Sequence, residues 1–199
     1  MRILLVYAHP NPESFNAALR DAALEALRGA GHEVHLLDLY AENFDPVLSR
    51  AERATYLPNT EINAAAVQPH LDLLKSCQGL VFVFPTWMYG PPAMLKGWLE
   101  RVMLPGYTFT VAKAKGERPG SLMRHVRFTA VITTSGSPWW WFALMGSPAR
   151  ILFMRGLGQL YAARSKKLWL QLYNINNATA EDRAGFLAKV RRKLGAVKG

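Results

Sequence analysis

The sequence predicts a doubly wound α/β fold with one five-stranded parallel sheet. Short apolar runs such as RILLVYA (residues 2–8) and LVFVF (80–84) recur along the chain, as expected of strands buried on both faces of a parallel sheet. Between them, apolar residues recur at three- and four-residue spacing, which predicts alternating helices that cover both faces of the sheet. Of the two common strand orders for such sheets, 2-1-3-4-5 suits five strands.

The first half of the chain is expected to supply two strands and two helices. Strands are predicted at 2–8 and 33–39, with a helix between them that is capped by Ser14 and stopped by glycines near residue 29. Residues 40–63 contain two prolines and predict an irregular segment with a helical turn near 49–56. A second helix is expected at 64–76.

The central stretch, residues 80–102, is expected to form a strand, a loop and a helix. Pro85 is expected to end the strand, and a helix follows from Pro92 to Val102. The remaining elements are a loop or small hairpin at 104–124, strands at 128–134 and 168–173, and helices at 149–155 and 180–194, the last capped by Thr179. Without a linker or internal repeat, residues 1–199 are predicted to form a single domain.

Composition narrows the class of protein. The start of the chain does not resemble a signal peptide, and no window approaches the ~20 apolar residues of a membrane span. Cys77 is the single cysteine and is expected to be a buried packing thiol in a cytoplasmic protein. The net charge of +10 is consistent with a solvated basic face or an anionic cofactor. Because no basic motif interleaved with aromatic residues is evident, a nucleic-acid partner is not expected.

Three loops should meet at one crevice, because strands one, three and four lie side by side and ligands bind beyond the carboxyl ends of such strands. They are residues 9–16, 85–90 and 133–141. The first leads into a helix N-terminus that could bind phosphate, although ordinary capping is the simpler alternative. The second pairs backbone amides with aromatic rings, and the third forms a small wall rich in backbone groups. The first loop thus offers a phosphate-binding site, called the phosphate corner below, and the other two enclose a slot for a planar ring. Together they suit a flavin nucleotide.

Other well-known motifs are missing from the sequence. Neither G-x-G-x-x-G after a strand nor G-x-x-x-x-G-K-[ST] occurs, which argues against a dinucleotide Rossmann fold and a P-loop. The two histidines of HEVH (32–35) would point to opposite faces of a strand, so no metal site is expected. No G-x-S-x-G motif marks a hydrolase.

Three runs of the sequence resemble one family. YAHPNPESFNAAL, LVFVFPTWMYGPPAMLKGWLERV and VITTSGS, together with residues 38–52, are similar to the NAD(P)H:quinone oxidoreductases of flavodoxin-like fold. That family includes DT-diaphorase, the modulators of drug activity and the Kef ancillary oxidoreductases. The likeness covers most of residues 2–137. It implies a homodimer that binds FAD or FMN, takes electrons from NAD(P)H and passes two of them to a quinone.

The resemblance also assigns roles to residues of this chain. The flavin phosphate would be held by His9, Ser14, Phe15 and Asn16. The isoalloxazine would be lined by Pro85, Thr86, Trp87, Met88 and Tyr89, and its pyrimidine side closed by Thr133, Thr134, Ser135 and Gly136. Met88 stands where the family usually has tryptophan, and no counterpart of its Tyr and His follows Gly136, so no catalytic residue is assigned.

The tryptophans support two further expectations. Trp139, Trp140 and Trp141 cannot all face one core, so at least one should face the crevice, solvent or a second subunit, as a substrate wall or as an interface plug. Trp98 adds apolar surface that a lone domain would expose, which predicts a homodimer. Two alternatives to the enzyme are a regulatory subunit that binds a membrane transport partner and an electron-carrier flavodoxin. The basic charge argues against the carrier.

Overall fold

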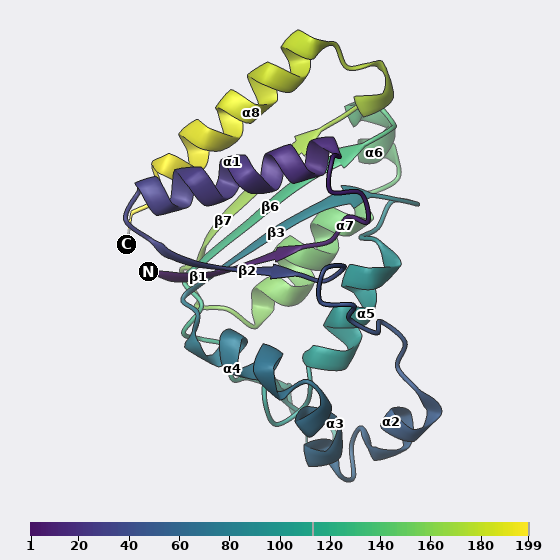
Figure 1. Cartoon of the computed structure of the whole chain (residues 1–199). Helices are drawn as coiled ribbons and strands as arrows, with labels where there is room; N and C mark the ends of the chain where they lie inside the picture. Colours follow the sequence, from purple (N-terminus) through teal and green to yellow (C-terminus); the bar gives the residue numbers. More distant parts are fainter. Residues whose placement is uncertain (113, 199) are drawn as a thin grey trace.

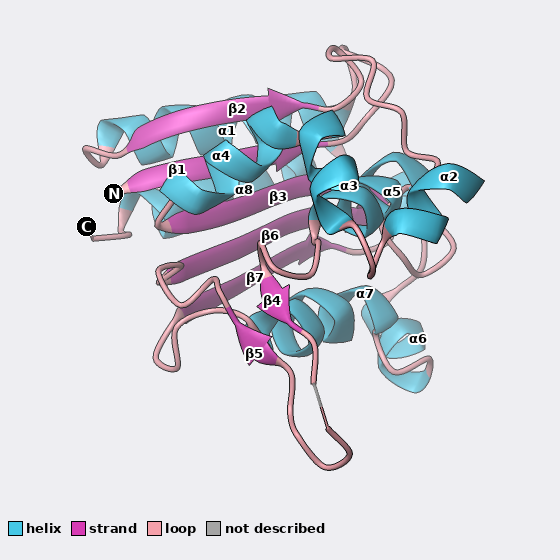
Figure 2. Ribbon diagram, turned by 90° about the horizontal axis from the view of Figure 1, so that it is seen from below, coloured by secondary structure: helices cyan, strands magenta, loops and turns pink. Residues whose placement is uncertain are grey.

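The computed structural model describes residues 1–112 and 114–198, and its main sheet has the predicted topology. Its strands are β1 (Arg2–Tyr7), β2 (Glu33–Asp38), β3 (Gly79–Thr86), β6 (Phe128–Ser135) and β7 (Lys166–Leu172). They lie in the order β2-β1-β3-β6-β7 and every neighbouring pair is parallel. Figure 2 shows this order from β2 at the top to β7 at the bottom. The predicted order 2-1-3-4-5 is therefore confirmed, with β6 and β7 as the fourth and fifth strands.

Helices cover both faces of the sheet, as predicted (Figure 1). One face carries α1 (Phe15–Gly29) and α8 (Ala180–Gly195), whose apolar sides share one core with β1, β3 and β6. The opposite face carries α4 (Gln68–Ser76), α5 (Ala93–Val102), α7 (Pro148–Ile151) and the π-helical turn η1 (Leu152–Gly156). The shorter helices are α2 (Arg50–Thr55), α3 (Thr60–Ala66), α6 (Trp139–Leu144), η2 (Leu157–Gln159) and η3 (Ile175–Asn177).

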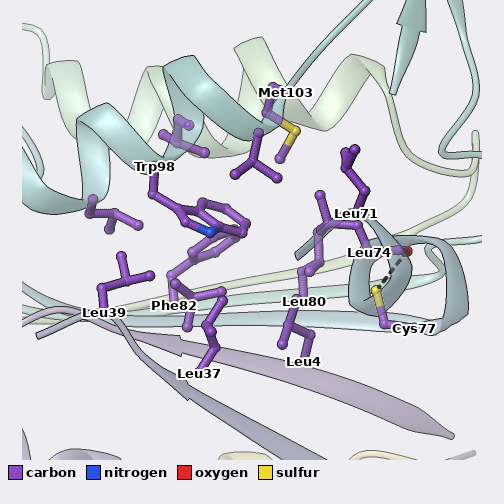
Figure 3. Packing of buried hydrophobic residues seen from close by; sticks show 14 of the residues in the cluster. Leu4, Leu37, Leu39, Leu71, Leu74, Cys77, Leu80, Phe82, Trp98 and Met103 are labelled. Carbon is purple, nitrogen blue, oxygen red and sulfur yellow. Dashed lines mark hydrogen bonds between the residues drawn. The ribbon is translucent and has the colours of Figure 1, made fainter. Parts of the chain in front are cut away.

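Trp98 lies at the centre of the second core, which corrects one expectation. Its side chain is 0% exposed and packs over Phe82 (Figure 3). Its indole N–H donates to His70 Nδ1 at 3.2 Å. A tryptophan on the inward stripe of a helix buries its large apolar surface against the sheet. Trp98 therefore adds nothing to an exposed surface, and the argument from it to a dimer was wrong.

Pro85 does not end the third strand, which is a second correction. β3 continues through Pro85 to Thr86, paired with β6 in the register Pro85↔Thr134. Along a parallel strand, alternate residues direct their backbone groups to the strand on one side and then to the strand on the other. The carbonyl of Val83 accepts from the N–H of Ala8, just past the end of β1, so Pro85, two residues further on, also faces the side of β1. Because β1 has already ended there, the missing N–H of Pro85 costs no hydrogen bond of the sheet.

Helix bounds differ from the predictions in three places. The helix expected at 64–76 is split into α3 and α4 at Val67, because Pro69 cannot donate within a helix and begins a new one. The tryptophan segment 139–144 forms the helix α6, whereas the sequence predicts a loop through residue 141. The helix expected at 149–155 is α7 followed by a π-helical turn.

Smaller predictions hold. The 104–124 connection contains a two-stranded hairpin, β4 (Phe109–Thr110) with β5 (Gly120–Ser121). The helical turn expected near 49–56 is α2, and the caps Ser14 and Thr179 each accept from a backbone N–H of their helix. Cys77 is buried, its thiol donates to the carbonyl of Leu74, and burial raises its pKa to about 12. Within the described ranges, none of the helices has the length and apolar character to cross a membrane.

Candidate functional site

The loop after β1 is a tight turn held by its own side chains. The backbone N–H of Asn11 donates to His9 Nδ1 at 3.0 Å, and that of Glu13 to Asn11 Oδ1 at 2.8 Å. Ser14 then caps α1, accepting from the N–H of Ala17 at 3.2 Å. A turn braced in this way delivers the N-terminus of α1 to the carboxyl edge of the sheet.

The first turn of α1 offers backbone groups rather than side chains. The first N–H groups of a helix have no partner inside it, so those of Phe15 and Asn16 point out of the helix. The Phe15 ring instead lies beneath Arg183, 5.9 Å from its guanidinium carbon, and the Asn16 amide donates to Thr134 Oγ1 at 3.1 Å. Phosphate binding by these two residues stays a prediction, now through their backbone.

The loop after β3 is a strained two-residue turn. Trp87 and Gly90 exchange backbone hydrogen bonds at 2.9 and 3.0 Å, which leaves Met88 and Tyr89 at the centre. Both have left-handed backbones, with φ of 46° and 64°. Such a turn normally takes Asn or Gly, and each non-glycine residue in this region costs roughly 1–3 kcal/mol. The turn projects the Met88 side chain outward, where it is 92% exposed. The surface formed by this turn and by α6 is called the rim below.

The end of β6 forms a wall whose hydroxyls are already paired inside the protein. Thr133 Oγ1 lies 2.8 Å from Thr86 Oγ1, and the Gln171 amide donates to Ser135 Oγ at 2.9 Å. A Cβ at Gly136 would approach Asn176 Nδ2 to 3.1 Å, so the chain passes close to the loop after β7. The wall therefore leaves its backbone edges for the predicted crevice.

The structure brings the three predicted loops together. The Asn16–Thr134 hydrogen bond links the first to the third, and the rings of His9 and Trp87 lie 5.8 Å apart across the first and second. The Oδ1 atom of Asn16 is buried at this junction without a partner among the described residues. An orphaned acceptor of this kind costs ~1–3 kcal/mol unless a ligand or water donates to it.

The three tryptophans divide between two roles. Trp139 and Trp140 are 67% and 54% exposed, which confirms that at least one of the three faces outward. Trp141 is half-buried, and its indole N–H donates to the Tyr89 hydroxyl at 2.8 Å. That bond ties α6 to the strained turn after β3, so Trp141 braces the rim that its two neighbours extend.

A fourth loop, after β7, was missed by the sequence analysis. The N–H of Asn174 donates to the carbonyl of Ser137 at 3.2 Å, and the ring of Tyr173 packs against Phe142 at 5.7 Å. The run YNINN, polar and directly behind a predicted strand, was the signal that could have found it.

Tyr7 and Arg20 lie beside the loop that is predicted to hold the phosphate. The Tyr7 hydroxyl lies 3.4 Å from Ser14 Oγ, and the guanidinium carbon of Arg20 lies 4.9 Å from the centre of the Tyr7 ring. Burial raises the pKa of Tyr7, so its hydroxyl stays protonated near neutral pH. Among the described residues no group of three His, Cys, Asp or Glu side chains is placed to hold a metal ion.

Comparisons with known proteins agree with this architecture. Residues 1–154 match the family described by its flavodoxin-like fold. The chain is 31% identical to NAD(P)H dehydrogenase (quinone) 1 of Cavia porcellus, over 97% of this chain and 76% of that protein. It is 35% identical to the Rattus norvegicus protein of the same name, over 68% of this chain and 54% of that protein. The solved structure of Smu.1420 from Streptococcus mutans UA159 superposes with a TM-score of 0.85 at 30% identity, covering 99% of this chain and 100% of that one.

Proposed function

Because the chain belongs to the NAD(P)H dehydrogenase (quinone) family, with its flavodoxin-like fold, we propose that it is a flavin-dependent NAD(P)H oxidoreductase. The acceptor is a quinone or a similar electrophile, and two electrons pass as hydride. Family membership confirms the resemblance found in the sequence and the assignment to the quinone-type oxidoreductases.

The observation that carries this proposal is the meeting of three loops at the carboxyl ends of β1, β3 and β6. One loop ends in a helix N-terminus with outward N–H groups, one carries aromatic side chains, and one offers backbone edges. The residues fit a flavin nucleotide on one further point. The orphaned Oδ1 of Asn16 needs a donor, and the ribityl hydroxyls of a flavin are donors.

Each group of residues has a distinct part in the reaction. When bound, the flavin supplies the hydride chemistry. The N–H groups of Phe15 and Asn16, with Ser14 and His9 beside them, would hold its phosphate. The backbone of residues 85–89 and of 133–136 would hold the ring edge and exclude water from one face.

The acceptor side is proposed to be the aromatic rim. The exposed rings of Trp139 and Trp140 offer flat apolar surface on which a quinone or a nicotinamide could stack, while Trp141 positions Tyr89. No catalytic acid or base is assigned.

Two measurements on the purified protein test the activity. A yellow chromophore released on denaturation should have the mass of FMN or FAD, and NAD(P)H oxidation should accelerate when a soluble quinone is added. A protein that releases no flavin and gains none when flavin is added would contradict the proposal. Flavin retention without NAD(P)H oxidation would favour the regulatory subunit.

A double variant tests the phosphate corner. Ser14→Ala with Asn16→Ala should weaken flavin affinity by ~1–3 kcal/mol, if two hydrogen bonds are lost. Because Ser14 also caps α1, Ser49→Ala is the matched control: it removes the cap of α2 without touching the crevice. Flavin titration of the refolded apoproteins measures both. Equal affinity in the double variant and the wild type would contradict a part for these two side chains and would leave the phosphate to the backbone N–H groups alone.

We also propose a cytoplasmic homodimer. Met88, Trp139, Trp140 and Leu144 are large apolar side chains exposed on or beside the rim. Surface of this kind usually marks an interface, and a second subunit would cover it. Light scattering should give about twice the chain mass of 22.3 kDa at micromolar concentration. A mass of one chain would contradict the dimer.

A further inference from the structure

A cavity lies outside the predicted crevice, between the segment α6–η1 and the edge strand β7. Its volume is about 490 Å³, within the range of small-molecule sites. Residues that line it include Ser147, Arg150, Arg155, Lys167 and Trp169. Figure 2 shows α6 and α7 beside β7, towards the carboxyl ends of the strands. A ligand in this cavity would therefore lie close to the catalytic edge of the sheet.

The cavity is strongly basic. Arg150, Arg155 and Lys167 contribute three positive charges, and no acidic residue is among those that line it. None of these three takes part in an ion pair within the described part of the chain. Lys167 donates instead to the carbonyls of Met154 and Gly158, at 3.0 and 3.3 Å. The two arginines are exposed and keep their forked donors for an anion.

One wall of the cavity is flat and aromatic. Trp169 is half-buried and lines it, and its indole N–H donates to Gln171 Oε1 at 2.9 Å. This bond fixes the orientation of the ring. Gln171 in turn donates to Ser135 at the end of β6, so the ring of Trp169 is linked through one residue to the wall of the crevice.

The cavity and the crevice also share a boundary. The N–H of Ala149 in α7 donates to the carbonyl of Tyr89 in the strained turn at 3.2 Å. The next residue, Arg150, lies near enough for its charge to act on Tyr173: burial raises the pKa of that phenol, and the charge of Arg150 opposes the rise. The segment 139–151 thus has the crevice at one end and the basic cavity at the other.

We propose that this cavity binds the phosphorylated adenosine end of NADPH and makes the protein prefer NADPH to NADH; the inference rests on the proposed function. Paired guanidinium groups suit a phosphate dianion, which they bind through charge-assisted forks. The adenine stacks on Trp169, and the nicotinamide reaches the crevice past Tyr89. NADH lacks the 2′-phosphate, so it gains less from Arg150 and Arg155.

Direct binding gives the first test. The probe is adenosine 2′,5′-bisphosphate, with 5′-AMP as the analogue that lacks the 2′-phosphate, both measured by isothermal titration calorimetry on the intact protein. The wild type should bind the bisphosphate at least tenfold more tightly than 5′-AMP. Arg150→Ala with Arg155→Ala should remove that difference. Arg192→Ala is the matched control, an exposed arginine on α8 away from the cavity, and should change binding less than twofold.

Steady-state kinetics with a soluble quinone give the second test. The double variant should raise the KM for NADPH at least tenfold and that for NADH less than threefold, with kcat within twofold of the wild type. Lys167 is left in place because it also donates to the backbone carbonyls of Met154 in η1 and Gly158 in η2.

Each outcome decides a separate point. Equal bisphosphate affinity in the wild type and the double variant would overturn the site, and an equal loss for the bisphosphate and 5′-AMP would overturn the 2′-phosphate assignment. A comparable loss in Arg192→Ala would show a general charge effect and overturn it as well. The protein could fail to oxidise NAD(P)H while bisphosphate binding is still lost only in the double variant. That result would support the site and disprove the proposed function.

Discussion

Trp98 on α5 and the pair Trp139–Trp140 on α6 show opposite uses of the same side chain. Trp98 is fully enclosed, with its N–H bonded to His70 and its rings against Phe82. Trp139 and Trp140 leave more than half of their surface to solvent. Both helices follow a central strand of the sheet, so position in the fold alone does not explain the difference.

The difference indicates where the protein is built for stability and where it is built for binding. Burying an indole contributes several kcal/mol, and α5 gains that amount in full. The rim instead keeps aromatic surface exposed and holds Met88 and Tyr89 in a costly left-handed turn. Apolar surface and backbone strain kept together at the carboxyl edge are typical of a site that a ligand or partner covers.

The largest expected effect comes from removing the enclosed indole. Trp98→Ala should lower the free energy of unfolding by about 3–5 kcal/mol, because it opens a cavity in the core and leaves His70 without its donor. Chemical denaturation followed by circular dichroism measures the change. The free energy of unfolding of Trp98→Phe should lie between those of the wild type and Trp98→Ala, because phenylalanine keeps most of the volume but cannot donate to His70.

Trp140→Ala is the control for that experiment. Trp140 is exposed on the single subunit, so the change should stay within ~0.5 kcal/mol of the wild type when the protein is dilute enough to be monomeric. A larger loss at concentrations where the protein is dimeric is expected if Trp140 lies in the proposed interface.

A smaller effect, on activity, is expected at the rim. At least one of Trp139→Ala, Trp140→Ala and Trp141→Ala should raise the quinone KM or lower kcat/KM at least tenfold, equivalent to ~1.4 kcal/mol. Flavin content and oligomeric state should be unchanged in that variant. Near-normal quinone kinetics in all three would place the substrate wall elsewhere and favour a structural plug.

The smallest effect is a pH dependence that arises under Trp98. Burial lowers the pKa of His70, and the positive charge of Arg101 lowers it further. The Nδ1 atom of His70 must be unprotonated to accept the hydrogen bond from Trp98. The unfolded chain takes up a proton near the ordinary value of about 6.5, whereas the folded protein resists it. The stabilisation is therefore complete above that pH and is lost as the pH falls through the lowered folded value.

Urea midpoints at pH 7.5 and pH 5.5 measure this dependence. His70→Gln should be less stable at pH 7.5 and should show a shallower fall towards pH 5.5. An identical slope in the wild type and the variant would mean that other groups carry the acid sensitivity.

Much of the fold could be predicted from local patterns. The five apolar runs and the glycines and prolines between them place β1, β2, β3, β6 and β7, and the number of strands suggests their order. The three crevice loops follow from that order. Ser14 and Thr179 were recognisable as caps because their hydroxyls precede apolar periodic segments.

Other features depend on what lies beside a residue in space. Pro85 remains in its strand because β1 has already ended on that side. α6 escaped prediction because WWWFAL has no polar face to give a period. The side chains of Phe15 and Asn16 turn away from the phosphate corner because α8 and β6 supply better partners.

By itself, the sequence determined the class of fold, the strands, the edge of the sheet at which the three predicted loops meet and the family. These follow from periodicity and from short motifs, both of which act over a few residues. The tertiary structure decided which tryptophan is buried and which is exposed. It also decided that Arg150, Arg155 and Lys167 share one cavity. Burial and the clustering of charges depend on elements that come together only when the chain has folded, so no local sequence pattern could have predicted either.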